Sequence, residues 1–565
     1  MVTLWNGSKG RERARGVVVG GPHPEFLSKQ ELARKLGQIV RLPGDNQHGR
    51  FSRRNLLLGA GVLASTAFAA DAAPDVAGAS TLSWPTKHLG SKAATTVDAS
   101  QFLSVAQLRQ WHEELDAMGM RSTGSPVHER FIDVLVSRLK QVGVEQVHTQ
   151  PVRFERWSAY AWSLELAEPH SKGMIATSSY IPYSGSTLSD GVTGPLSLIK
   201  AGEALPPGSL AGKIALFDVP TSPVAYSTME EISYGKYDPQ DLIDPAAQYS
   251  RPWGGVSDLI TLLDNLQVTG AIGCIGIIDL PAAGAHGSYY PYDGTIRRVP
   301  GVFVDRPTGQ YLSALSISST PVRLTLAATT QHVVSRNVVG LIPGRSNEVV
   351  ILNSHTDGPN AVEDNGPNTI IAISQYLSRL PQDALPRSVM VSFTTGHFHG
   401  GIGQVTFVKD NRDSILPKAA CALTLEHLGA LEWEENAENE MALTGRPELG
   451  VIFVPENKAM VDASLAALQR ARAGPALVLR PYVTAAGSPN GYGWPGEGTQ
   501  LWSAGHVMTM NYITGPTYLL NWGIPTLHKC DISRMRREAI AFTQMTLDVC
   551  GTTRWSLASL DLSPL

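Results

Sequence analysis

The sequence predicts an α/β protein: a three-layer, mostly parallel sheet flanked by helices, with a β-rich insertion. After residue 335, short apolar strands alternate with helices, which is typical of parallel strands. From about 170 to 330 the chain instead has short apolar runs interrupted by Gly and Pro, which indicates a separate unit. The alternating elements are the strands 348–354, 388–394 and 420–425 and the helix 369–380.

Two helices and a strand are expected before the insertion. Apolar residues recur at helical spacing in two stretches, and Gly143 is suited to end the second helix. A strand follows from Val152 to Leu166. The apolar positions are Leu108, Trp111, Leu115 and Met118, then Phe131, Leu135, Leu139 and Val142.

The composition excludes some classes of function. Apolar residues make up 43% of the 565 residues and charged residues 17%, which is typical of a globular chain. A formal net charge of -4 offers no basic excess for a nucleic-acid partner. Cys274, Cys421, Cys530 and Cys550 form no CxxC pair, so no thiolate metal site is expected. Cys530 and Cys550 either pair after export or stay free.

The first hundred residues contain an export signal. Phe51-Ser-Arg-Arg-Asn-Leu-Leu-Leu-Gly59 leads into an apolar run too short for a membrane span, and Ala67-Phe-Ala69 suits a signal peptidase. Twin arginines indicate the export route for folded proteins. We therefore expect a leader over 1–70, a linker over 71–98, and a periplasmic or secreted protein with no stable membrane span. The basic, Gly-rich stretch before residue 51 means either a later start or a long leader.

The insertion resembles a protease-associated domain. Its Gly212–Val219 strand, its helix running into a strand through Thr269-Gly-Ala271, and its Val299–Asp305 strand match that pattern. We predict this domain over 169–334, inside a discontinuous catalytic domain formed by 99–168 and 335–565. The resemblance implies that the insertion covers or shapes an active site.

The candidate site lies where the strands after 335 end. Sites in open α/β sheets form at the carboxyl ends of the strands, and here these ends carry His355, His397 and Glu426. His355 begins the motif His355-Thr-Asp-Gly-Pro-Asn-Ala-Val-Glu-Asp-Asn-Gly366. We expect His355 to bind a metal, Asp357 to orient its other ring nitrogen, and Asp364 to bridge two cations. Histidine and carboxylate suit zinc, with manganese or cobalt as alternatives.

These motifs resemble the zinc aminopeptidase and carboxypeptidase family, which has two co-catalytic metals. The stretches Ser335–Gly344 and Arg121-Ser-Thr-Gly-Ser125 match it as well. The resemblance implies His355 as a ligand, Asp364 as the bridging ligand and Glu426 as the acidic ligand. It also implies a terminal ligand late in the chain. That ligand is His528, or the position falls near 518–520, where no ligand exists.

The chain departs from the family pattern after the strand 388–394. The family has two adjacent glutamates there, a general base and a metal ligand, but this chain has Gly396-His-Phe-His-Gly-Gly401. Three interpretations follow. His397 acts as the base, or His397 or His399 replaces the missing ligand, or the second metal site is lost.

We therefore expect an exported hydrolase that cleaves peptides or small-molecule amides with one or two zinc ions. The alternatives are an altered metallohydrolase acting on a non-peptide amide, ester or lactone, and a non-catalytic metal-binding homologue. His427 and His506 are expected to be structural or to line the pocket. In the loop 491–498, Tyr492 and Trp494 either pack against substrate or belong to a mobile loop.

Overall fold

The computed structural model describes residues 93–167 and 173–562. Its central sheet confirms the predicted α/β class. The neighbouring strands β13, β12, β14 and β21 run parallel, and antiparallel strands flank them. Their bounds are Ser388–Thr394, Val349–His355, Ala419–Leu425 and Thr509–Thr514. The first three match the predicted strands to within one residue.

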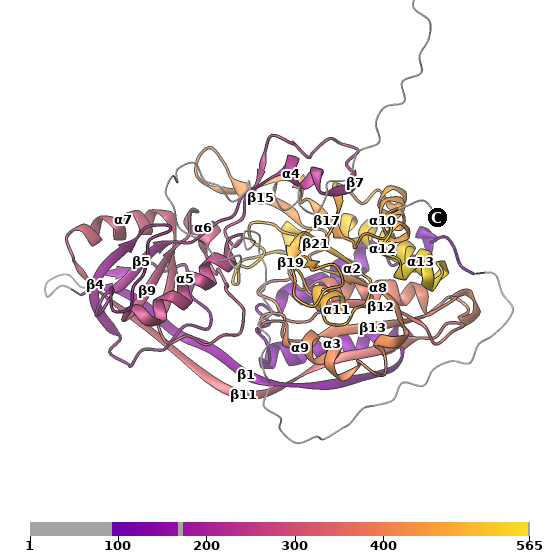
Figure 1. Ribbon diagram of the computed structural model, residues 1–565, viewed down its shortest axis with the longest axis horizontal. Helices are drawn as coiled ribbons and strands as arrows, with labels where there is room; N and C mark the ends of the chain where they lie inside the picture. The colour runs from indigo at the N-terminus through magenta and orange to yellow at the C-terminus, as the bar shows by residue number, and fades with distance from the viewer. Residues whose placement is uncertain (1–92, 168–172, 563–565) are drawn as a thin grey trace, which may run out of the picture. The chain divides into compact units, whose positions relative to one another are not determined.

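Helices cover both faces of this sheet (Figure 1). Alternate side chains of a strand point to opposite faces, and Val349, Ile351 and Met390 share a core cluster with Phe407 and Leu501 of two helices. These two helices are α9 and α11, and α8 lies against β12 in the helical layer that also contains α2, α3 and α12. The bounds are Ile402–Asp410, Thr499–Ser503, Gly366–Leu377, Val105–Ala117, Pro126–Gln141 and Ile532–Gly551.

Helix α8 begins in close contact with the strand ends. A Cβ atom on Gly366 would lie 2.1 Å from the Leu425 carbonyl oxygen and 2.2 Å from Ser354 Oγ. A larger residue would therefore push the helix away from β12 and β14. This contact fixes the chain just before α8, where the carboxylates of the motif lie.

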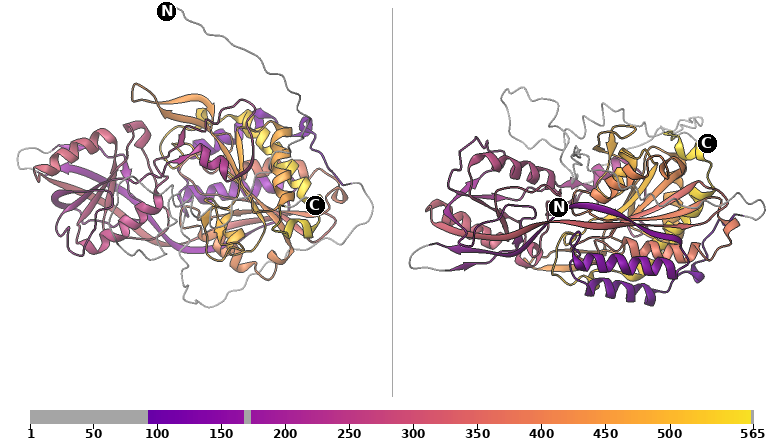
Figure 2. Two further views of the ribbon diagram at one scale, coloured as in Figure 1. Left: turned by 45° about the horizontal axis from the view of Figure 1, so that its top comes forward. Right: turned by 90° about the horizontal axis from the view of Figure 1, so that it is seen from below.

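Strands β1 (Glu145–Leu166) and β11 (Pro321–Ile342) connect the sheet to the inserted segment. They pair antiparallel from Glu145 with Leu341 to Leu166 with Val322, and form a long ribbon (Figures 1 and 2). We call the residues between them, 167–320, the insert. The boundary expected at 334/335 lies inside β11, and the division into domains stays a prediction.

The strands of the insert continue the central sheet, because β4 pairs antiparallel with β11. Strands β4, β5, β9 and β10 run parallel, and the helices α5 and α7 accompany them. Strand β7 (Ser233–Tyr237) instead pairs with β18 (Ala476–Leu479) at the edge of the central sheet. The other bounds are Val192–Ile199, Ile214–Asp218, Gly273–Ile277, Gly301–Val304, Val256–Thr269 and Arg306–Ile317.

Other sequence-based expectations concern cysteines and export. All four cysteines are free and buried, so Cys530 and Cys550 do not pair. Within 93–167 and 173–562, no helix has the length and apolar character that crossing a membrane requires. The twin-arginine segment and most of the expected linker lie outside the described residues.

His112 makes the fold sensitive to acid. It lies on the buried face of α2, and neither ring nitrogen has a hydrogen-bond partner. Burial lowers the pKa of His112 to about 4. The unfolded chain binds this proton below about pH 6.5, whereas the folded chain does not until about pH 4. Stability contributed by the neutral ring is therefore lost as the pH falls through this window.

We expect His112→Leu to reduce the loss of unfolding free energy between pH 7 and pH 4.5 by about 2 kcal/mol. Urea unfolding at the two pH values measures this difference. His332→Leu is the control, because His332 is exposed. An unchanged pH dependence in His112→Leu would contradict the account of a buried neutral imidazole.

Candidate metal centre

Three parallel strands bring the predicted site residues together. His355 ends β12, His397 follows β13 and Glu426 follows β14. Because β12 pairs with both neighbours, the three carboxyl ends lie at one edge of the sheet. The sequence-based placement of the site at the strand ends agrees with this arrangement.

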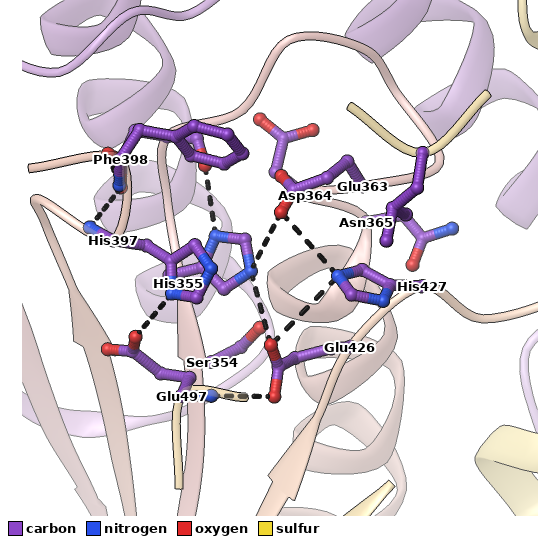
Figure 3. Close-up of polar contacts among 12 residues, drawn as sticks. Ser354, His355, Glu363, Asp364, Asn365, His397, Phe398, Glu426, His427 and Glu497 are labelled. Carbon is purple, nitrogen blue, oxygen red and sulfur yellow. Dashed lines mark hydrogen bonds and ion pairs between the residues drawn. The ribbon is translucent and has the colours of Figure 1, made fainter. Parts of the chain in front are cut away.

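Four buried donor atoms converge at this edge (Figure 3). His355 Nε2 lies 3.6 Å from both Glu363 Oε1 and Glu426 Oε2. His427 Nε2 lies 3.5 Å from Glu363 Oε1 and 3.9 Å from Glu426 Oε2. A tetrahedral zinc ion with bonds of about 2.0–2.1 Å holds its ligand atoms about 3.4 Å apart. The observed separations are therefore close to those of a zinc site.

Two histidines of the site are oriented by their Nδ1 atoms. Nδ1 of His355 lies 2.9 Å from the Asp357 carbonyl oxygen, and Nδ1 of His427 lies 2.7 Å from the Thr514 carbonyl oxygen. A carbonyl oxygen only accepts, so each Nδ1 is the protonated donor and each Nε2 keeps its lone pair. His355 Nε2 and His427 Nε2 are buried without a hydrogen-bond partner. This is the arrangement of histidines that bind a metal.

The charge of the site also calls for a cation. Glu363, Glu426 and Glu497 are at most 3% exposed, and no lysine or arginine among residues 93–167 and 173–562 forms an ion pair with them. By contrast, buried Asp364 is paired with Arg121. Burying a carboxylate without a partner is costly, and a divalent cation removes that cost. The nitrogen and oxygen donors fit zinc.

The close approach of these buried carboxylates and histidines shifts their pKa values. Burial acts to raise the pKa of Glu426, but the interaction with nearby His355 and the positive charges that the histidines carry when protonated lower it to about 2. Burial raises the pKa of Glu363. Burial lowers the pKa of His397, and so does His355, yet Glu497 and Glu363 bring it above its ordinary value. The pKa of Glu426 is thus shifted below its ordinary value, and that of Glu363 above it.

Glu497 is a site residue that sequence reasoning missed. Its Oε2 lies 2.8 Å from His397 Nδ1, and its Oε1 accepts a hydrogen bond from the Thr394 hydroxyl. Its backbone N–H donates to Glu426 Oε1 at 3.0 Å. Gly496 permits this approach with a φ of +117°, because a Cβ there would lie 2.9 Å from the same oxygen. An acidic residue between two glycines was the signal in the sequence.

His427 belongs to the cluster, although the sequence favoured a structural or pocket-lining role. Its φ of +58° is left-handed and turns the chain directly after Glu426. As a result the two consecutive side chains both reach the site. Glu363 was missed in a similar way, since Asp364 beside it matched the family pattern.

Asp357 acts differently from the expectation. Its backbone carbonyl, not its carboxylate, contacts the His355 ring. The carboxylate accepts hydrogen bonds from the backbone N–H groups of His397 at 3.1 Å and Phe398 at 3.0 Å, and from the Thr123 hydroxyl at 2.5 Å. Asp357 therefore holds the turn that carries His397.

Asp364 does not point into the donor cluster. Arg121 Nε lies 2.5 Å from Asp364 Oδ2, and Arg121 Nη2 lies 2.7 Å from Oδ1. Both carboxylate oxygens are thus used by the guanidinium. The bridging role implied by the family resemblance stays a prediction, and this geometry favours a structural role.

His399 and His528 are not brought to the cluster. His399 lies beside the insert, with Nδ1 3.3 Å from the Tyr183 hydroxyl and its ring 4.8 Å from that of Phe154, and burial lowers its pKa to about 4. His528 is exposed, and its Nε2 lies 3.1 Å from Lys529 Nζ. The turn after β13 directs His397 inward and His399 outward, which explains why two nearby histidines differ.

The loop 494–500 borders a small cavity beside His397 and Glu497. The cavity measures about 20 Å³, and a water molecule requires about 10–15 Å³. Trp494 is 1% exposed, stacks between Phe453 and Trp502, and donates to Asn511. Trp494 is therefore a packing residue of a well-anchored loop, not a free platform for substrate.

The fold is that of the zinc aminopeptidases, and it confirms the resemblance at that level. A zinc aminopeptidase from Bacillus subtilis is 14% identical, with a TM-score of 0.54 over 78% of this chain and 94% of that chain. A peptidase M28 precursor from Shewanella amazonensis is 17% identical, with a TM-score of 0.56 over 82% of this chain and 98% of that chain.

A curated relative lies in the same class. Carboxypeptidase Q of Homo sapiens is 21% identical over 318 residues, which are 53% of this chain and 60% of the length of that protein. No protein-family model matches the chain. The relationship is thus distant.

We expect Asp364→Asn to destabilise the protein by about 3–5 kcal/mol and to leave its zinc content unchanged, because it leaves the buried Arg121 charge unpaired. Urea unfolding and elemental analysis measure the two effects. The exposed Asp413→Asn is the control. A folded Asp364→Asn protein that lacks zinc would instead make Asp364 a ligand.

Proposed function

We propose that the chain is a zinc-dependent hydrolase that cleaves peptide or amide bonds with water. The observation that carries the proposal is the convergence of His355 Nε2, His427 Nε2, Glu363 and Glu426 without a compensating cation. The fold shared with zinc aminopeptidases supports it. So does the similarity to a protein called carboxypeptidase Q.

We infer a single zinc ion held by these four residues. The family resemblance implies an acidic ligand where Phe398 stands, and a phenyl ring binds no zinc. Asp364, the implied bridging ligand, is used by Arg121. The group His355, Glu363 and His397 could also hold an ion, but we assign His355, Glu363, Glu426 and His427 to one zinc ion and keep His397 as the base.

His397 is the proposed general base. A bound zinc ion would lower the pKa of its water towards ~7 and polarise the scissile carbonyl. A ring nitrogen of His397 lies within 4.8 Å of a ring nitrogen of His355 and of a carboxylate oxygen of Glu363, so His397 is within reach of a water bound there. The Glu497 carboxylate accepts a hydrogen bond from His397 Nδ1–H. It therefore stabilises the imidazolium that forms when His397 Nε2 accepts the water proton.

A small substrate is favoured over a long peptide. The site residues are at most 5% exposed, and the cavity beside His397 has room for about one water molecule. A substrate must therefore displace residues at the rim of the site, which costs less for a small-molecule amide, ester or lactone, or for a dipeptide, than for a long peptide. Hydrolysis of a panel of aminoacyl amides, acyl amides and lactones tests this point.

Metal analysis tests the centre. We expect about one zinc per chain in the wild type and a loss of most of it in His427→Ala and Glu363→Gln. His528→Ala, which lies outside the cluster, retains zinc. Two zinc ions in the wild type, or an unchanged content in His427→Ala, would contradict the single-ion centre.

The base has a separate test. We expect His397→Ala to keep its zinc and to lose about a hundred-fold to ten-thousand-fold in kcat on the best substrate of the panel. Full activity in this variant would contradict the role of His397.

We also propose export through the twin-arginine route to the periplasm or the medium. The proposal rests on Arg53-Arg54 and the apolar run behind them. The double variant Arg53→Lys, Arg54→Lys is expected to stay inside the cell, as measured by fractionation and immunoblotting. Arg50→Lys is the control, and an unchanged distribution of the double variant would contradict the proposal.

A further inference from the structure

The insert is joined to the rim of the candidate centre by backbone hydrogen bonds. Tyr289 N–H donates to the Leu520 carbonyl at 2.8 Å, and Trp522 N–H donates to the Gly287 carbonyl at 2.8 Å. Gly400 N–H donates to the Tyr292 carbonyl at 2.9 Å. The segment 287–292 is therefore hydrogen-bonded both to the turn after β13 and to the loop 520–522.

Phe398 shows how closely this segment packs. Phe398 is 1% exposed and belongs to the same core cluster as the strands of the insert, although it follows β13 of the central sheet. Its ring centroid lies 4.5 Å from that of Tyr292 and 5.8 Å from that of Tyr289. The residue next to His397 thus fixes the insert in place.

The side chain of Tyr292 borders the site itself. Its ring centroid lies 5.4 Å from that of His397, and the residue is half-buried. Its hydroxyl forms no hydrogen bond with any residue in the described part of the chain. The hydroxyl of the neighbouring Tyr183, by contrast, donates to the Phe398 carbonyl. Tyr292 thus keeps a free donor next to the proposed base.

The electrostatics of the site keep this donor protonated. Burial raises the pKa of Tyr292, and the negative charges of Glu363, Glu426 and Glu497 raise it further. At neutral pH Tyr292 is therefore a neutral hydrogen-bond donor.

We propose that Tyr292 is a catalytic residue supplied by the insert, whose hydroxyl donates a hydrogen bond to the carbonyl oxygen of the substrate as that oxygen becomes negative. This inference rests on the proposed hydrolysis. The water oxygen adds to the carbonyl carbon while the C=O π pair moves to oxygen. One water proton passes to His397 and then to the leaving nitrogen as the C–N bond breaks, which gives an acid and an amine. Tyr292 keeps its own proton throughout.

Tyr292→Phe tests the proposal, because it removes the hydroxyl and keeps the ring. Loss of one such donor costs about a hundred-fold to a thousand-fold in kcat. We expect kcat and kcat/KM to fall equally, with KM unchanged, because the hydrogen bond strengthens only in the transition state. Zinc content and melting temperature should equal those of the wild type.

A binding measurement gives a readout that needs no turnover. Inorganic phosphate is a tetrahedral anion and acetate is a planar one. By calorimetry on the zinc-loaded protein, we expect Tyr292→Phe to weaken phosphate binding at least ten-fold and acetate binding less than two-fold. A phosphate defect in a protein that hydrolyses no substrate would support the donor role of Tyr292 while refuting the proposed function.

Tyr290→Phe is the matched control. Tyr290 lies two residues away, its hydroxyl is buried without a partner, and its ring packs on Phe303 in the core of the insert. It should match the wild type in both assays. Unchanged turnover and phosphate binding in Tyr292→Phe would overturn the proposal. Equal losses in both variants would also overturn it, since they would indicate a purely structural effect.

Discussion

The structure around the candidate centre depends on two buried carboxylates that no lysine or arginine of residues 93–167 and 173–562 neutralises. Glu363 and Glu426 approach the Nε2 atoms of two histidines, and each carboxylate keeps one buried oxygen without a hydrogen bond. Such a cluster repels itself unless a cation holds it. The carbonyl groups that orient the histidines and the glycine that admits the Glu497 backbone all serve to keep these donors in place.

The elements of the fold were predictable because their signals are local. The apolar runs that became β12, β13 and β14 are short, continuous and bounded by polar residues, so their ends were clear. Since the strands are parallel, His355, His397 and Glu426 were expected at one edge. The direction in which a side chain points after a strand end is harder to predict from the sequence. Tight turns set this direction, and neighbouring residues in such a turn can point to opposite sides.

Three pairs of neighbours illustrate this limit. Asp364 matched the family pattern, yet Glu363 beside it faces the histidines. Glu426 was expected, and the left-handed turn at His427 adds the next side chain to the site. His397 points inward, whereas His399 packs against Phe154 and Tyr183. Glu497 comes from a distant loop, which no spacing rule in the sequence connects to β13.

The ribbon of β1 and β11 has a consequence for how the chain assembles. Leu166 and Val322 are paired at its far end, so the insert leaves and re-enters the ribbon at neighbouring points. An unfolded loop of that length makes the pairing of the two strands entropically costly, although the cost grows only slowly with length. An insert that folds first holds its own ends together and removes most of that cost. Strands β1 and β11 can then pair progressively, from Leu166 and Val322 beside the insert to Glu145 and Leu341 beside β13. In this order the strands that carry the candidate site join the ribbon last.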